Sequence, residues 1–314
     1  MANKSLEAHF IKCLKEGNTK KALYIVELLG NKINNLYRGK SPLLWAKEFE
    51  NKEVARVLKE KGAVEDVISD EEAEKLGLEL VEKAKVGDLD AVIELIEKGA
   101  NLEKKYKDGD TALMIASKNG HVEVVEALIE NGAKVDEKDN DSRTALTFAS
   151  LNGHVEIVKA LLSRGAKVDE KDNKGDTALI KASRYGHVEV VKTLIENGAK
   201  VNEKDNRGYT ALIWASENGH VEVVEALIEN GAKVDEKDNK GYTALMRASY
   251  SYKRRAEVIK ALLDAGAKVD EKNNGGNTAI DLTDDDEIKK MLRKALRKQK
   301  MMNVKNKISD FFGR

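Results

Sequence analysis

The sequence predicts an all-α repeat solenoid, and three short motifs that return at one fixed spacing are the evidence for it. Thr-Ala-Leu, Gly-His and Gly-Ala each recur every 33 residues along the chain. Three independent markers with one period indicate a tandem array of similar units. Stability in such an array comes mostly from contacts between neighbouring units, so we expect no central core. The motifs begin at Thr111, Thr144, Thr177, Thr210 and Thr243, at Gly120, Gly153, Gly186 and Gly219, and at Gly99, Gly132, Gly165, Gly198 and Gly231.

The residue pattern of each unit predicts two helices joined by a turn, as the unit at 173–205 illustrates. Thr177 precedes an apolar stretch and suits an N-cap, where its hydroxyl accepts a hydrogen bond from a free backbone N–H. Gly186 follows that stretch and suits the left-handed residue that commonly ends a helix. The next apolar residues are spaced three and four apart, as on one buried helical face. Polar turn residues at 200–208 then lead to the next unit.

The order Asp-x-x-Gly-x-Thr-Ala-Leu, then Gly-His, then Gly-Ala resembles the ankyrin repeat family, whose pattern begins Asp-x-x-Gly-x-Thr-Pro-Leu-His. The resemblance is strong over residues 74–297 and good over 38–66, whereas residues 5–37 match only as a helix pair. It implies helix–turn–helix units with hairpin-like loops, stacked in one curved array that ends in a degenerate C-terminal capping repeat. One departure is systematic: the histidine of the family motif is missing, and we expect apolar packing to replace it in most repeats. The residues in its place are Met114, Thr147, Ile180, Ile213 and Met246.

Nine units fit the sequence, and we group them into three regions. Residues 1–69 hold two divergent ankyrin-like repeats, residues 70–297 form the main array, and residues 298–314 form a basic amphipathic tail. The third unit starts with a longer helix near Asp70, so the segment 64–74 is the expected discontinuity in the stack. The units span 5–37, 38–69, 70–106, 107–139, 140–172, 173–205, 206–238, 239–273 and 274–297.

Charge and cysteine content exclude several classes of protein. The 314 residues carry 55 basic and 55 acidic side chains, for a formal net charge of zero. The single cysteine, Cys13, rules out a disulfide framework and a cysteine-ligated metal site. No apolar stretch approaches the ~18–20 residues of a membrane helix, and the charged N-terminal residues do not form a secretory signal. We therefore expect a monomeric, cytoplasmic protein.

No residue pattern supports catalysis or metal binding. The histidine of each Gly-His motif occupies the same site in its unit, so these histidines lie along the array instead of converging, and we assign them a structural role. Residues 169–175 resemble a calcium loop, but lysine stands at the third position and the glutamate expected at the twelfth is missing. The chain also lacks a Gly-rich phosphate loop and a nucleophile elbow. We predict that it is not an enzyme and uses no cofactor, metal or small-molecule substrate.

Function in a repeat array is expected where near-identical units differ, because stacking explains the shared positions. The differences concentrate four residues after the motif threonine, just before it, and at the end of the first helix. The ankyrin resemblance implies that these positions line the concave surface and the hairpin edge, where protein partners bind. Aromatic and arginine residues, which dominate interface hot spots, gather there in the sixth to eighth units. The candidate partner-binding residues are Phe148, Arg184, Tyr185, Tyr209, Trp214, Tyr242, Arg247, Tyr250 and Tyr252.

Two interpretations of these residues stay open. In the first they form a binding patch, because units with Lys181 and Arg247 at the position of Trp214 do not suit a core role. In the second, Trp214 and the tyrosines cover the inner helices of their own repeats, and Phe148 packs locally. We favour the binding patch.

The C-terminal residues are strongly basic. Residues 288–314 hold ten Lys or Arg and one Asp, a net charge of +9, which leaves −9 on the rest of the neutral chain. Apolar residues from Ile288 to Leu296 predict the second helix of the capping repeat, and those between Val304 and Phe312 are spaced for a second short amphipathic helix. Such a tail docks on the acidic repeats or contacts an anionic membrane. Nucleic acid is disfavoured, because no basic groove studded with aromatic residues accompanies the tail.

The sequence thus resembles a non-enzymatic ankyrin-repeat scaffold that binds another protein. Its preformed surface would lose little entropy on binding, so that a few side chains dominate the affinity. The alternative is a peripheral membrane adaptor that uses the basic tail, with Phe311 and Phe312 as its anchor.

Overall fold

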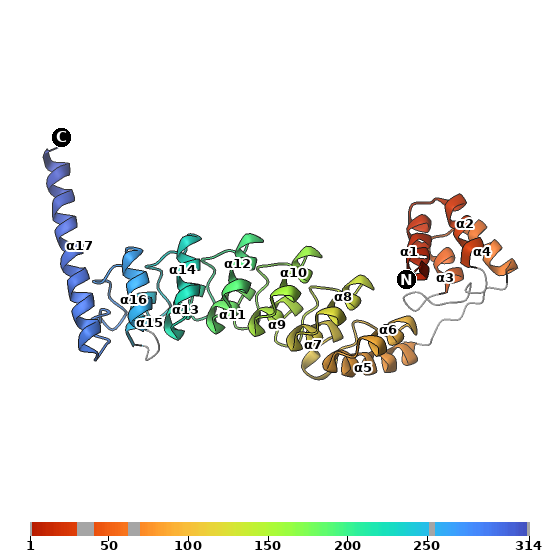
Figure 1. The fold of residues 1–314 in the computed structure, drawn as a ribbon, viewed down its shortest axis with the longest axis horizontal. Helices are drawn as coiled ribbons and strands as arrows, with labels where there is room; N and C mark the ends of the chain where they lie inside the picture. The colour runs from red at the N-terminus through yellow and green to blue at the C-terminus, as the bar shows by residue number, and fades with distance from the viewer. Residues whose placement is uncertain (1, 30–40, 62–69, 251–254, 313–314) are drawn as a thin grey trace. The chain divides into compact units, whose positions relative to one another are not determined.

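The computed structural model describes residues 2–29, 41–61, 70–250 and 255–312, and these residues form helices joined by turns and loops, with no strand among them (Figure 1). The predicted all-α repeat class is confirmed. Most of the predicted discontinuity at 64–74, and the candidate Tyr252, lie outside the described residues. The chain divides into two compact units, residues 1–134 and 135–314, and each is described by itself below.

The first unit contains helices that follow one another in antiparallel pairs. In chain order these are α1 (Ala2–Lys15), α2 (Thr19–Leu29), α3 (Pro42–Glu48), α4 (Lys52–Glu60), α5 (Asp70–Val86), α6 (Leu89–Glu97), the short 3-10 helix η2 (Lys107–Gly109), α7 (Ala112–Asn119) and α8 (Val122–Glu130). The long helix α5 begins at Asp70, as the sequence predicts.

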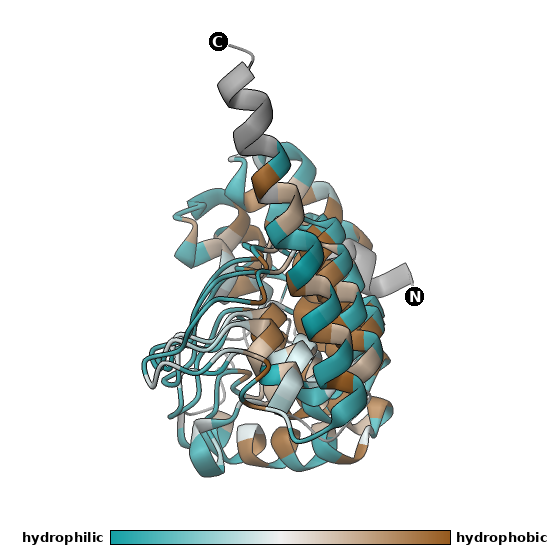
Figure 2. Ribbon diagram, turned by 90° about the vertical axis from the view of Figure 1, so that its left-hand side faces the viewer, coloured by the Kyte–Doolittle hydropathy of each residue, from teal (hydrophilic) through white to brown (hydrophobic). Residues whose placement is uncertain are grey.

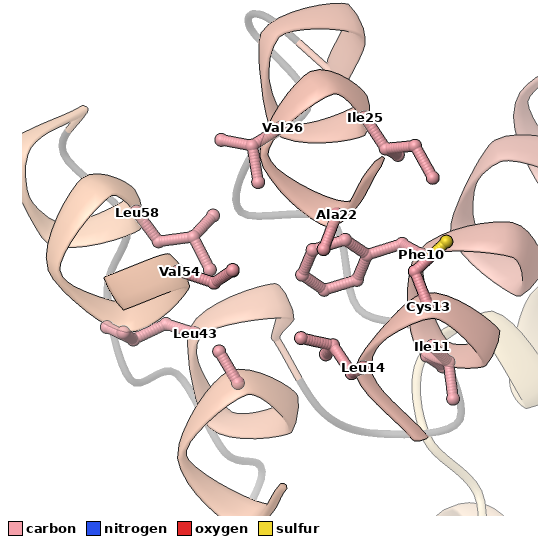
Figure 3. Close-up of a cluster of buried hydrophobic side chains, with 11 residues drawn as sticks. Phe10, Ile11, Cys13, Leu14, Ala22, Ile25, Val26, Leu43, Val54 and Leu58 are labelled. Atoms are coloured by element: carbon pink, nitrogen blue, oxygen red, sulfur yellow. The ribbon is translucent and has the colours of Figure 1, made fainter. Parts of the chain in front are cut away.

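Helices α1 to α4 enclose an apolar cluster of their own (Figure 3). Phe10 and Leu14 of α1, Val26 of α2, Leu43 of α3 and Leu58 of α4 belong to this cluster, and the Phe10 ring lies toward Ala22 of α2 (Figure 3). All of these side chains are buried, which accounts for the apolar spacing of these short helices. The helix pair predicted for residues 5–37 is therefore confirmed in its described part.

The second unit repeats one helix pair four times. Its helices are α9 (Ala145–Asn152), α10 (Val155–Ser163), α11 (Ala178–Tyr185), α12 (Val188–Glu196), α13 (Ala211–Asn218), α14 (Val221–Glu229), α15 (Ala244–Tyr250), α16 (Arg255–Asp264) and α17 (Asp286–Phe312). The first helices of the pairs, α9, α11, α13 and α15, pack in one layer, and the second helices, α10, α12, α14 and α16, pack in another. The loops that precede the first helices project to one side of them (Figure 2).

The recurring motifs form the helix ends that the sequence predicts. Oγ1 of Thr177 accepts a hydrogen bond from the backbone N–H of Ile180 over 3.3 Å and caps α11. Gly186 ends that helix in the left-handed region, with φ of 80°. Residues that replace the family histidine are buried, among them Ile180, Ile213 and Met246, so apolar packing takes its place as expected. Thr147 instead forms a capping box with Thr144.

The histidines of the Gly-His motifs connect neighbouring repeats. Nε2 of His187 lies 2.9 Å from the backbone carbonyl oxygen of Leu151 in the preceding repeat. The imidazole also packs on Gly153, where an added Cβ would lie only 2.5 Å from its Nδ1. His220 makes the equivalent contacts with Arg184 and Gly186. The structural role predicted for these histidines is confirmed.

In the last repeat, turns at residues 279–282 stand where a first helix would be, and α17 is hydrogen-bonded to the end of the preceding repeat. Ile288 and Leu292 of α17 are buried, as predicted for the second helix of a capping repeat. Farther along, Nε2 of Gln299 donates to the carbonyl of Ala267 over 2.7 Å. The separate second helix predicted near Val304 is wrong, since α17 runs unbroken for 27 residues. No Gly or Pro interrupts Asp286–Phe312, and its many Lys, Arg, Met and Leu residues favour a continued helix.

Candidate protein-binding face

The second unit carries a face built from the loops and the first helices, which we call the hairpin-side face. Each of the four loops that precede a first helix contains a buried aspartate that holds the turn. In the loop that joins the sixth and seventh repeats, Oδ1 of Asp205 accepts hydrogen bonds from the backbone N–H groups of Arg207 and Tyr209, over 2.9 and 2.8 Å. Such side-chain-to-backbone bonds are typical of aspartate in turns. The equivalent aspartates are Asp139, Asp172 and Asp238.

The other carboxylate oxygen of each aspartate receives a side chain that differs between repeats. Oδ2 of Asp205 accepts from Nε1 of Trp214 over 3.2 Å. Lys181 lies nine residues after Asp172, and the same spacing joins Arg247 to Asp238, so an ion pair replaces the indole in those repeats. In these three repeats, the position four residues after the motif threonine therefore supplies the partner of a buried carboxylate.

In the fifth repeat, another residue donates to the loop aspartate, because Phe148 at this position cannot donate a hydrogen bond. Nε of Arg143 donates to Oδ2 of Asp139 over 2.6 Å instead. The guanidinium carbon of Arg143 lies 4.7 Å from the centroid of the Phe148 ring, within the range of a cation–π contact. Phe148 thus packs locally under Arg143, one of the two roles that the sequence leaves open.

The structure corrects the expectation that this position lies outside the core. Trp214 is 5% exposed, Phe148 is 1% exposed, and Lys181 itself is only 8% exposed. Lys181 is buried because its ammonium group forms ion pairs with two buried carboxylates, those of Asp172 and Asp176, at 2.8 and 2.5 Å. A lysine at an equivalent position is therefore no sign of exposure here.

Lys181, Asp172 and Asp176 form a buried triad, in which the pKa values of Asp176 and Lys181 are shifted. Burial raises the pKa of the Asp176 carboxyl, although the hydrogen bond from Lys181 opposes this effect. Burial alone would lower the pKa of Lys181, but its hydrogen bonds with Asp172 and Asp176 outweigh burial and raise that pKa. Oδ1 of Asp176 is buried without a hydrogen-bond partner. Two carboxylates here share one cation.

Arginines and aromatic rings from the sixth to eighth repeats form one continuous set of contacts. The rings of Tyr209 and Trp214 have centroids 4.7 Å apart. The Arg184 guanidinium carbon lies 3.8 Å from the Trp214 centroid, and that of Arg207 lies 4.4 Å from it. Arg247 lies 4.7 Å from the Tyr209 centroid and 4.2 Å from that of Tyr242. We call these six residues the Arg–aromatic cluster: Arg184, Arg207, Tyr209, Trp214, Tyr242 and Arg247.

The cluster brings together five of the nine predicted binding residues. Arg207 also belongs to the cluster, although it is not among the residues predicted from the sequence. It lies at the tip of the loop, whereas the prediction used the residue just before the motif threonine. Tyr209 is buried, and this burial, together with the nearby Glu217 carboxylate, raises the pKa of its phenol to about 12. Arg247 also pairs with Glu217 at 3.5 Å. Most of the aromatic area is therefore covered by side chains of the chain itself.

The remaining predicted residues lie at the ends of first helices or outside the cluster. Tyr185, at the end of α11, is 50% exposed, and Tyr250, at the end of α15, is 61% exposed. The Arg184 guanidinium lies 5.9 Å from the Tyr185 ring centroid, which connects Tyr185 to the edge of the cluster. Phe148 belongs to the separate contact with Arg143.

The described residues lack both the side-chain cluster of a metal site and the long apolar helix of a membrane span. They contain no group of three or more His, Cys, Asp or Glu side chains arranged to hold a metal ion. Among the helices for which the structure gives coordinates, none has an apolar stretch of the length required to cross a bilayer.

Helix pairs with threonine N-caps, left-handed glycines and loop aspartates define an ankyrin-type repeat protein. The family model for ankyrin repeats (three copies) matches residues 80–172, 137–205, 161–238 and 202–273. The crystal structure of the human ASB11 ankyrin repeat domain is similar, with 30% sequence identity and a TM-score of 0.64 over 69% of this chain and 96% of that one. No curated protein matches the chain. The chain belongs to the ankyrin repeat family, whose members are generally non-enzymatic modules that bind other proteins.

Proposed function

We propose that this chain is a non-enzymatic scaffold that binds another protein through the hairpin-side face of its fifth to eighth repeats. The Arg–aromatic cluster is the observation that carries the proposal. It extends over three successive repeats at positions where the repeats differ. Arginine and aromatic residues are the commonest interface hot spots.

The burial of the cluster divides its members into two roles. Trp214 and Tyr209 are largely covered and act as the support on which the guanidinium groups rest. Tyr185 and Tyr250 are exposed at the ends of α11 and α15, and these side chains contact the partner. Because contacts within the chain hold the face in place before binding, little side-chain entropy is lost when the partner arrives.

The test uses the exposed tyrosines, because they are not part of the packed interior. We expect the double variant Tyr185→Ala/Tyr250→Ala to lose capture of the partner from a native lysate, while its far-UV circular dichroism and thermal midpoint stay unchanged. The matched control is Tyr24→Ala, which removes an equally exposed tyrosine from α2. If the double variant captures the same proteins as the wild type, binding through this face is refuted.

A second candidate function rests on the end of α17. Met301, Met302 and Val304 are exposed there, and exposed lysines such as Lys300 and Lys305 lie among them. A helix end of this composition suits the surface of an anionic membrane. The side chains of Phe311 and Phe312 lie outside the described part of the chain.

Cosedimentation with vesicles of phosphatidylserine and phosphatidylcholine tests the membrane candidate. The wild type is expected to sediment with these vesicles at low salt, and Met301→Ser/Met302→Ser/Val304→Ser is expected to stay in the supernatant. Sedimentation of both proteins to the same extent, or of neither, contradicts a membrane contact through this helix end.

A further inference from the structure

Three cations form a row along the hairpin tips of the sixth, seventh and eighth repeats. They are Lys174, Arg207 and Lys240, each two residues after the loop aspartate, and all three are exposed. Backbone hydrogen bonds join successive tips, since the N–H of Asn206 donates to the carbonyl of Lys174 and the N–H of Asn239 donates to that of Arg207, both over 3.0 Å. We call the three cations the tip row.

Other lysines in the same loops hold neighbouring repeats together. Nζ of Lys171 lies 2.7 Å from Oε2 of Glu203 in the next repeat. It also donates to the backbone carbonyl of Lys204 over 3.0 Å. The hydrogen bond from Lys171 holds the pKa of Glu203 below its usual value. The equivalent pairs are Lys204–Glu236 and Lys237–Glu271.

The tip row has no comparable role in stacking. Within the part of the chain that the structure describes, no ion pair involves Lys174 or Lys240. Nε of Arg207 lies 3.8 Å from Oδ2 of Asp205, but that oxygen already accepts the hydrogen bond of Trp214. The charges of the tip row are therefore available to a group from outside the chain.

The aspartates that hold these loops lie beneath the surface. The side chains of Asp172, Asp205 and Asp238 are at most 3% exposed. Each already accepts hydrogen bonds through both of its oxygens. A partner that approaches the tips therefore meets ammonium and guanidinium groups, because these three aspartates are buried. The partly exposed glutamates of the same loops, such as Glu203, are already paired with lysines.

Arg207 belongs to both the tip row and the Arg–aromatic cluster, so the two surfaces are continuous. Its guanidinium carbon lies 4.6 Å from the Tyr209 ring centroid and 4.4 Å from that of Trp214. Arg184 lies against the same indole. A guanidinium group that is already positioned by an aromatic ring loses less side-chain entropy when it forms a bidentate pair with a carboxylate.

The ends of the tip row limit what it can bind. The fifth repeat has Asp141 at the tip position, with a side chain 65% exposed, and the last repeat has Gly275 there. The three cations attract an acidic segment of a partner, and the exposed Asp141 carboxylate at one end of the row repels a longer one, so the row suits a short acidic segment. Nucleic acid offers an unbroken line of phosphates, which favours a longer basic surface without an acidic end.

We propose that the tip row and Arg184 bind a carboxylate-rich extended segment of a partner protein, with acidic side chains placed on successive hairpin tips. This inference rests on the proposed function, because it names the chemistry of the partner that the hairpin-side face would bind. The cluster supplies the apolar contacts beside the row, and the row supplies the charge complementarity that selects an acidic sequence.

Fluorescence anisotropy of a labelled peptide with alternating glutamate and serine tests the proposal on the full chain. We expect this peptide to bind the wild type, and the matching glutamine–serine peptide not to bind. The triple variant Lys174→Gln/Arg207→Gln/Lys240→Gln is expected to bind the glutamate peptide about tenfold more weakly, a loss of roughly one decade in the dissociation constant. The control Lys159→Gln/Lys192→Gln/Lys260→Gln makes the same charge change on α10, α12 and α16 and is expected to bind as the wild type does.

Two results overturn the proposal: equal binding of the glutamate peptide by the two triple variants, or tighter binding of labelled oligothymidylate through the same three residues. Circular dichroism of each variant shows that the fold is intact. The capture experiment separates this inference from the proposed function. A partner that is lost from Tyr185→Ala/Tyr250→Ala but retained by Lys174→Gln/Arg207→Gln/Lys240→Gln supports the binding face and refutes the acidic segment.

Discussion

Nε1 of Trp214 donates a hydrogen bond to Oδ2 of Asp205 over 3.2 Å, where the sixth repeat meets the seventh. The indole thus satisfies the second oxygen of a carboxylate whose first oxygen holds the preceding turn. In the last loop the aspartate is replaced by Asn273, which makes the same turn contacts through Oδ1, and the residue nine positions later is the apolar Leu282. The loop acid is therefore matched by a side-chain donor, either at the variable position or, in the fifth repeat, at Arg143, and loss of that donor is expected to require another.

Trp214→Phe is the direct test of this pairing. The Phe ring fits, since Phe148 is buried at the equivalent position of the fifth repeat, but it leaves Oδ2 of Asp205 without its donor. Loss of one partner of a buried polar group costs about 1–3 kcal/mol. We expect a decrease of this size in the free energy of unfolding, measured with urea by circular dichroism.

The fifth repeat supplies the matched rescue. Arg143 there occupies the position of Tyr209 and donates to Asp139 beside Phe148. Tyr209→Arg in the Trp214→Phe background copies that arrangement and is expected to recover most of the lost stability. If Trp214→Phe is as stable as the wild type, the hydrogen bond to Asp205 contributes nothing to stability. If Trp214→Phe is less stable and Tyr209→Arg recovers none of the loss, Arg cannot replace the indole as donor in this repeat.

Lys181→Met tests the buried triad of the sixth repeat. The substitution keeps much of the side-chain volume but leaves Asp172 and Asp176 buried without their cation. Breaking a buried ion pair on one side costs about 3–5 kcal/mol, and we expect a destabilisation of this order. Lys192→Met is the control, because Lys192 forms an exposed ion pair with Glu189 at 2.9 Å, and exposed pairs contribute about 0–1 kcal/mol. Equal effects of the two substitutions would contradict the assignment.

Asp176→Asn is expected to change how stability depends on pH. Burial raises the pKa of Asp176 above its unfolded value, so the folded state binds more protons between the two values, and the stability of the wild type falls as pH rises through that interval. The variant cannot titrate there and is expected to gain stability at neutral pH. This gain should shrink when urea unfolding is repeated near about pH 4, the ordinary range of an aspartate. A gain that is the same at both pH values would contradict the prediction.

Much of this fold can be predicted from the sequence because its signals are local. Threonine caps, left-handed glycines and apolar spacing each act within one helix, and α11 illustrates all three. The end of α17 is different, since the apolar residues near Val304 have amphipathic spacing while the unbroken run of helix-forming residues keeps one helix. Amphipathic spacing predicts a helix but does not tell where one helix stops and another begins.

The candidate site could be predicted only in part, because burial depends on partners distant in sequence. The variable positions were found by comparing repeats, and five of the predicted residues do meet in the Arg–aromatic cluster. Their exposure was misjudged at Trp214, because Lys181 at the equivalent position suggested a surface. A lysine can be buried when two carboxylates surround it, and the sequence of one repeat does not show that both Asp172 and Asp176 point at the same ammonium group.

Gly153→Ala tests the contact that joins the fifth and sixth repeats. Gly153 has φ of 78°, and a Cβ there would lie 2.5 Å from Nδ1 of His187. Gly165→Ala is the control, with φ of 84° and no atom within 4 Å of the added Cβ. Both variants bear the cost of a left-handed alanine, about 1–2 kcal/mol, so any larger loss in Gly153→Ala comes from displacing the imidazole and its hydrogen bond to Leu151.

The His187→Ala background isolates that displacement. With the imidazole absent, Gly153→Ala is expected to cost no more than Gly165→Ala, whereas in the wild-type background it costs more. The four unfolding energies, measured with urea by circular dichroism, form a double-mutant cycle for glycine and histidine. A cycle with no coupling energy would mean that the glycine is required by its backbone conformation alone. Coupling would show that the Gly-His motif holds its 33-residue period because the histidine of each repeat packs on the glycine of the repeat before it.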